Sequence, residues 1–128
     1  MLFWTAVAVS IVHYTDNFLS YDDYPHGTGP EPSAGVVLGA WFVLTPFGLA
    51  GYLLYMRGRI RAGAMLLVVY STSGLVGIGH YTVAGMTDEP VWRQAHVVAD
   101  VLLGAGIFAF AVWSILRLPR TFRPATAG

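Results

Sequence analysis

The sequence predicts an all-α membrane protein in which four transmembrane helices form a compact antiparallel bundle, with both termini in the cytoplasm. Three observations lead to this fold class: the composition, the spacing of four apolar segments and the distribution of arginine. Hydrophobic residues make up 55% of the chain and charged residues 11%, whereas about 25% of an ordinary soluble domain is charged. This composition indicates that most of the protein surface faces a bilayer.

Four apolar segments supply the expected helices of a single domain that covers residues 1–128. Each is close to the roughly 20 residues that cross a hydrocarbon core of about 30 Å. The expected helices cover residues 2–20, 34–56, 62–84 and 91–116, and a cytoplasmic tail covers 117–128. Short connections between helices predict that consecutive helices run antiparallel.

The first expected helix is the least apolar, because its uninterrupted apolar run ends at Val12. A secretory signal peptide is the alternative for this segment. However, no positively charged residue follows Met1 and no Ala-x-Ala cleavage site is present. A transmembrane helix is therefore the favoured interpretation.

Arginine predicts the orientation of the bundle. Six of the seven basic residues lie between the second and third helices or after the fourth: Arg57, Arg59, Arg61, Arg117, Arg120 and Arg123. Positively charged connections stay in the cytoplasm, so both termini are expected there, in a plasma or inner membrane. All the acidic residues and all four histidines then lie toward the outer side.

The same composition excludes several classes of function. The formal net charge is zero and there are no basic clusters with interleaved aromatic residues, which argues against nucleic-acid binding. The chain has no cysteine, so disulfides, thiolate catalysis and cysteine-ligated metal sites are excluded.

Histidines and carboxylates on three expected helices form the candidate site. His13 and Asp16 are three residues apart and His96 and Asp100 are four apart, so each pair shares one side of its helix. With a rise of 1.5 Å per residue, these two pairs and His80 reach a similar depth in the outer half of the bundle. Ionisable groups at such depth usually face the bundle interior or a wet cavity, and they mark functional sites.

A metal or haem site is the first functional hypothesis. Imidazole and carboxylate groups suit zinc, iron or copper(II), and histidines on facing helices can also ligate haem. The candidate cofactor ligands are the three histidines, and the candidate metal ligands add both aspartates: His13, Asp16, His80, His96 and Asp100. In this hypothesis Asp100 is either a ligand or the group that orients His96.

Other hypotheses remain open, and the sequence does not decide whether the protein is an enzyme. A lipid-modifying enzyme or lipid-binding protein would use His96 and Asp100 as an acid–base pair. Alternatively, the polar groups only form contacts between helices. The protein would then be an accessory subunit of a larger membrane complex or a homo-oligomer, surrounded by membrane lipids.

The longest connection, residues 21–33, lies on the same predicted side as the candidate site. Its many turn residues favour an ordinary solvated loop. A lid over the site is the alternative, with Asp22, Asp23, His26 and Glu31 as its polar groups.

Overall fold

The computed structural model describes residues 1–117, which fold into four α-helices and three short 3₁₀ segments. In chain order these are α1 (Leu2–Leu19), η1 (Tyr21–Asp23), α2 (Ala34–Met56), α3 (Ile60–Leu75), η2 (Val76–Thr82), η3 (Met86–Asp88) and α4 (Val91–Arg117). The all-α prediction is confirmed, and the predicted tail lies outside the described residues from position 118 onward.

Three helical segments of the described chain are long and apolar enough to cross a membrane: α2, the continuous segment Ile60–Thr82 and α4. The first helix, α1, does not meet this criterion. Its 18 residues correspond to about 27 Å at 1.5 Å per residue, and polar side chains interrupt its second half. The protein is therefore a helical bundle with three candidate membrane spans.

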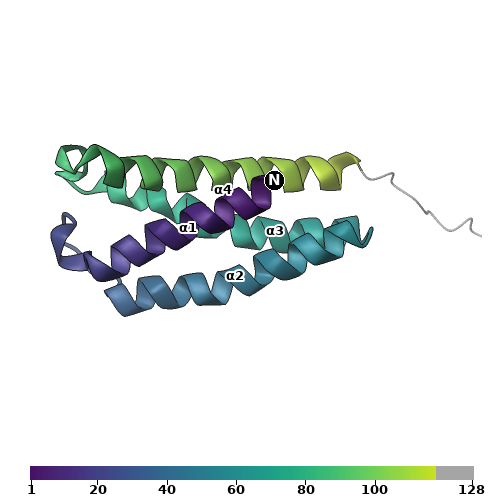
Figure 1. Ribbon diagram of the computed structural model, residues 1–128, viewed down its shortest axis with the longest axis horizontal. Coiled ribbons are helices and arrows are strands. Elements are labelled where there is room, and N and C mark those ends of the chain that lie inside the picture. The colour runs from purple at the N-terminus through teal and green to yellow at the C-terminus, as the bar shows by residue number, and fades with distance from the viewer. Residues whose placement is uncertain (118–128) are drawn as a thin grey trace, which may run out of the picture.

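The helices form a ring in which α1 packs against α2 and α4, and α3 packs against the same two helices. Consecutive helices are antiparallel, and α1 runs obliquely across the bundle (Figure 1). The two connections at the left of Figure 1 define the histidine end of the bundle, formed by residues 13–33 and 76–100. The opposite end, where α2 meets α3 and α4 ends, is called the arginine end.

Most of the apolar core lies toward the arginine end. It contains side chains from α1, α3 and α4: Phe3, Ala6, Ala64, Leu67, Tyr70, Ile107 and Ala111. A smaller cluster of Tyr24, Met86 and Val97 lies at the histidine end. The interior between these two clusters contains buried polar groups, so the candidate site is set into the bundle itself.

The third predicted helix, residues 62–84, differs from the structure in its last part. The α-helix ends at Leu75 and continues as the 3₁₀ segment η2, which carries His80. Here α3 lies very close to α4: a Cβ on Gly74 would collide with the carbonyl oxygen of Asp100, so only glycine fits at this position. The glycines that permit this contact are weak α-helix formers, and the sequence prediction did not anticipate the change to 3₁₀ geometry.

Candidate functional site

The deepest polar contact at the histidine end joins α1 to α4. His13 and Asp100 are only 3% and 2% exposed, and His13 Nδ1 lies 2.7 Å from Asp100 Oδ2. A carboxylate only accepts hydrogen bonds, so Nδ1 of His13 carries a proton and donates a hydrogen bond to Asp100. This bond leaves Nε2 of His13 as the nitrogen that faces away from α4.

His80 extends this contact from α1 to η2. Its Nε2 lies 3.4 Å from His13 Nε2, and a hydrogen bond over this distance requires a proton on one of the two nitrogens. Asp100, His13 and His80 therefore form a continuous series of hydrogen-bonded groups, called the histidine chain below.

Close packing around His13 holds the histidine chain in place. A Cβ added to Gly77 would lie 3.2 Å from Cε1 of His13, so the imidazole packs directly on the backbone of η2. The neighbouring Tyr14 donates from its buried hydroxyl to the Ser73 carbonyl at 2.7 Å. Asn17 donates to the His13 carbonyl at 3.0 Å. The contacts of His13 with Gly77 and of Tyr14 with Ser73 set the register of α1 against α3 and η2, whereas the Asn17 bond lies within α1.

A cavity of about 500 Å³ lies beside the histidine chain. Its walls come from the end of α1, the 21–33 connection, the start of α2 and η2, and both His13 and His80 contribute to it. The connection that was predicted to be either a solvated loop or a lid therefore forms one wall of the cavity, while most of its residues also face outward.

Two contacts close the wall of this cavity. His26 Nδ1 lies 2.7 Å from Glu31 Oε2, and the Gly27 amide donates to Glu31 Oε1. The His26 hydrogen bond and the Gly27 amide both lower the pKa of the Glu31 carboxyl. The ionised carboxylate therefore holds the turn that forms the rim.

A second polar cluster surrounds Arg93 of α4, which is 7% exposed. Its Nη1 donates to Glu89 Oε2 at 2.6 Å, and its Nε lies 3.3 Å from Asp16 Oδ2. The guanidinium also lies over the ring of Tyr24, with Cζ 4.5 Å from the ring centroid. Arg93, Asp16, Glu89 and Tyr24 are called the arginine cluster.

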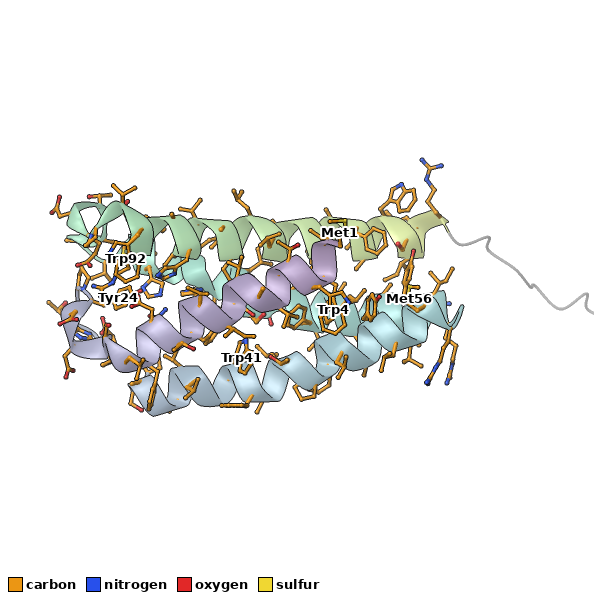
Figure 2. All side chains as sticks on the ribbon, in the orientation of Figure 1. Met1, Trp4, Tyr24, Trp41, Met56 and Trp92 are labelled. Atoms are coloured by element: carbon orange, nitrogen blue, oxygen red, sulfur yellow. The ribbon has the colours of Figure 1, made fainter. Side chains whose placement is uncertain are left out.

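Tyr24 is the member of the arginine cluster that comes from the loop of residues 21–33. Its hydroxyl donates to Asp16 Oδ2 at 2.5 Å. Burial and the adjacent Asp16 carboxylate raise the pKa of this hydroxyl well above its usual range. Tyr24 therefore stays protonated and keeps its role as a donor. Figure 2 shows Tyr24 and Trp92 at the histidine end, whereas Trp41 lies between α1 and α2.

His96 lies between the two clusters. Its Nε2 is 3.2 Å from Asp16 Oδ2, and its ring centroid is 5.6 Å from that of His13. Its side chain is 9% exposed, and neither ring nitrogen has a well-formed hydrogen bond within the described residues. His96 is thus close to both clusters but does not connect them.

All five predicted site residues lie at the histidine end, but in two separate arrangements. His13, His80 and Asp100 form the histidine chain, whereas Asp16 belongs to the arginine cluster with His96 beside it. A pair of Asp100 with His96 on the same helix was one of the alternatives from the sequence, but the hydrogen bond that the structure shows is to His13. The four-residue spacing allows a contact between His96 and Asp100 but does not impose one, and the His96 ring lies instead beside Trp92 and Asp16.

The geometry does not support the predicted metal or haem site. Within residues 1–117, no group of three or more histidine or acidic side chains is arranged to hold a metal ion. Of the predicted ligands, Asp16 is occupied by Arg93 and Tyr24, and Asp100 by Nδ1 of His13. The 3.4 Å between the Nε2 atoms of His13 and His80 also leaves no space for a haem plane between them.

Four residues that contribute to these arrangements were not among the predicted site residues. Glu89 and Arg93 are four residues apart, a spacing that indicates a possible ion pair on a helix. This contact could therefore have been predicted from the sequence. Tyr24 and Gly77 meet partners that are distant in sequence, and no local pattern indicates those contacts.

Comparison with protein-family models, curated proteins and solved structures gives no match to this chain. The site geometry is therefore the basis for a functional proposal.

Proposed function

We propose that this is a small polytopic membrane protein that binds a small ligand in the cavity at its histidine end. The histidine chain contacts the ligand through His80 and acts as an acid–base group. The observation that carries this proposal is the series Asp100–His13–His80, which begins at a buried carboxylate and ends at a residue that lines a cavity of about 500 Å³. Ligand pockets commonly enclose about 300–1,000 Å³.

A histidine whose ring is oriented by a carboxylate is a common acid–base arrangement. Asp100 orients His13 and stabilises positive charge on it. A proton that reaches Nδ1 of His80 can then be balanced by release of its Nε2 proton to His13. Burial of the ionisable pair His13 and Asp100 costs free energy. This cost favours a functional role of the pair over a purely structural contact.

Retention of a ligand tests the proposal. Wild-type protein is extracted from its native membrane directly into lipid nanodiscs, without chelators, and analysed by mass spectrometry and elemental analysis. We expect one small molecule per chain in the wild type and in His96→Asn, and its loss in His80→Asn. His96→Asn is a matched control, because His96 lies close to the histidine chain but does not line the cavity.

Two outcomes would contradict this function. Either equal ligand content in both variants, or a wild type without any stoichiometric small molecule, would remove the role of His80. A stoichiometric metal that is lost in His80→Asn would instead support the metal hypothesis from the sequence.

A lipid-modifying enzyme is the second candidate, and the buried 2.7 Å contact between His13 and Asp100 favours it. Asp100→Asn keeps the shape of the side chain but removes its negative charge. If the protein is an enzyme, the variant retains a substrate that differs chemically from the molecule held by the wild type. If it only binds, both proteins hold the same molecule.

We further propose that α1 is a fourth membrane span, so that residues 1–128 form one transmembrane domain with the arginine end in the cytoplasm. Support comes from the position of α1 in the helical ring and from the exposed Arg57, Arg59 and Arg61 at one end. The plasma or inner membrane is the proposed location. Contact with lipids follows from this arrangement, whereas a homo-oligomer or a larger complex stays a prediction.

The absence of cysteine makes the orientation testable by labelling. Gly29→Cys and Arg59→Cys place single thiols at the histidine and arginine ends, and Gly29 has open space around its Cβ position. A membrane-impermeant maleimide added to intact cells should label only Gly29→Cys. Labelling of Arg59→Cys alone would reverse the proposed orientation.

A further inference from the structure

The cavity beside the histidine chain has an unusual polarity for a site at a membrane surface. Its lining within residues 1–117 contains no arginine, and the chain has no lysine. Arg93, the basic residue nearest to the site, is held by Glu89 and Asp16 in the arginine cluster. The cavity therefore offers imidazoles, but no arginine or lysine, to a phosphate or carboxylate head group.

The hydroxyl groups that line the cavity are already bonded within the protein. Each donates to an acceptor of the chain itself: Tyr14 to Ser73, Tyr21 to Pro32, Tyr24 to Asp16 and Thr82 to Gly79. These side chains consequently present mainly their apolar parts to a ligand. Such walls favour a hydrocarbon body.

His80 provides a polar contact at the inner part of the cavity. Its Nε2 faces His13, and no hydrogen bond among the described residues uses its Nδ1. When both histidines are neutral, Nδ1 of His13 donates to Asp100, so His80 supplies the proton between the two Nε2 atoms. A neutral imidazole carries only one N–H, so Nδ1 of His80 is then an acceptor.

Two cavity residues also indicate how a ligand enters. Val37 belongs to α2 and Val76 to the continuous segment Ile60–Thr82, and both segments are long and apolar enough to cross a membrane. The cavity thus lies between two membrane helices, where an amphiphile dissolved in the bilayer can reach it. The rim on the other side carries the Glu31 carboxylate, which disfavours anions.

We infer that the ligand is an uncharged lipid with a hydroxyl group, which donates a hydrogen bond to Nδ1 of His80 while its apolar body fills the cavity. This inference rests on the proposed function and adds the chemical class of the ligand. Phospholipids and fatty-acid anions are excluded from the class, because the cavity would desolvate their charge without an arginine or lysine partner while its histidines are neutral.

Photoreactive C12 probes with the same diazirine tail and different head groups test the inference. The probes are an alcohol, a phosphate and a trimethylammonium compound, added to wild-type protein in phosphatidylcholine nanodiscs, with labelled peptides mapped by mass spectrometry. We expect the alcohol to label residues 21–32 and 76–83 about tenfold more than either charged probe, the scale expected for one hydrogen bond and an unpaired buried charge. His80→Asn should abolish this labelling and His96→Asn should retain it.

A competition experiment avoids any loss of folding in the variants. Unlabelled dodecanol should compete with the alcohol probe on the wild-type protein at about tenfold lower concentration than dodecyl methyl ether, which has no O–H to donate. Equal competition by the ether would overturn the hydroxyl assignment.

The outcomes separate this inference from the proposed function. If a charged probe labels the cavity as strongly as the alcohol and depends on His80, the neutral-lipid class is wrong while the binding function stands. If no probe labels the cavity in a manner that depends on His80, both are overturned.

Discussion

The histidine chain and the arginine cluster lie at the same end of the bundle, and both contain carboxylate groups. They differ in whether a polar group remains free to contact a ligand. In the arginine cluster, Arg93 is surrounded by the carboxylates of Asp16, Asp23 and Glu89 and by two aromatic rings. In the histidine chain, a buried carboxylate is connected through two imidazoles to a cavity. A closed charge network stabilises the connection between helices, whereas an open one can exchange a proton or a hydrogen bond with a ligand.

Replacement of Arg93 tests whether the arginine cluster stabilises the fold. Arg93→Met leaves Asp16 and Glu89 without their cation, and breaking a buried ion pair costs about 3–5 kcal/mol. Unfolding by denaturant in detergent micelles should show this loss. Arg59→Met, an exposed residue at the arginine end, is the control and should change stability by less than about 0.5 kcal/mol. An unfolding midpoint of Arg93→Met equal to that of the control would mean that the cluster does not hold the fold.

Two glycines of η2 test the packing beneath His13. In Gly77→Ala the new methyl lies 3.0 Å from Val101 and 3.2 Å from His13, whereas Gly79→Ala meets nothing within 4 Å. Overpacking costs about 1–3 kcal/mol, so Gly77→Ala should unfold earlier than Gly79→Ala and retain less ligand. The same unfolding and mass-spectrometric measurements apply to both. Identical behaviour of the two variants would show that the position of His13 does not depend on this contact.

Loss of a single hydroxyl gives a smaller effect. Tyr14→Phe removes a buried hydrogen bond to the Ser73 carbonyl, which should lower the free energy of unfolding by about 1 kcal/mol. Tyr21→Phe removes a bond of similar length to Pro32 in an exposed position and should cost less. The order of the two unfolding midpoints checks this expectation, and the reverse order would place the more important contact in the loop.

The smallest effect concerns the rim of the cavity and depends on pH. Because the pKa of the Glu31 carboxyl is lowered, its stabilising contribution is fully present above the ordinary pKa of a glutamate, 4.5. This contribution is lost as the pH falls through the lowered pKa. Hydrogen exchange at the Gly27 amide should therefore show decreasing protection below pH 4.5. Glu31→Gln should remove this pH dependence; an unchanged profile in the variant would exclude Glu31 as its source.

Several features of the fold are readable from particular residues. The composition and the segment from Ala34 to Met56 predict a membrane helix, and the structure has a helix with those bounds. The end of the third helix is different. Glycines in the third and fourth helices indicate that these helices can approach closely, but not that the third helix continues in 3₁₀ geometry. Likewise, the low apolar content of α1 is visible in the sequence, but its place between α2 and α4 is not.

Sequence alone is sufficient to place His13, His80, His96 and both aspartates near one end of a helical bundle, since helix length and residue spacing set their depth. Packing in three dimensions selects the partners. The rotation of each helix about its axis and the register of α1 depend on contacts such as Gly77 with His13 and Gly74 with α4. For this reason Asp100 meets His13 from another helix, while Asp16 joins Arg93, and only one of the two carboxylates leads to the cavity.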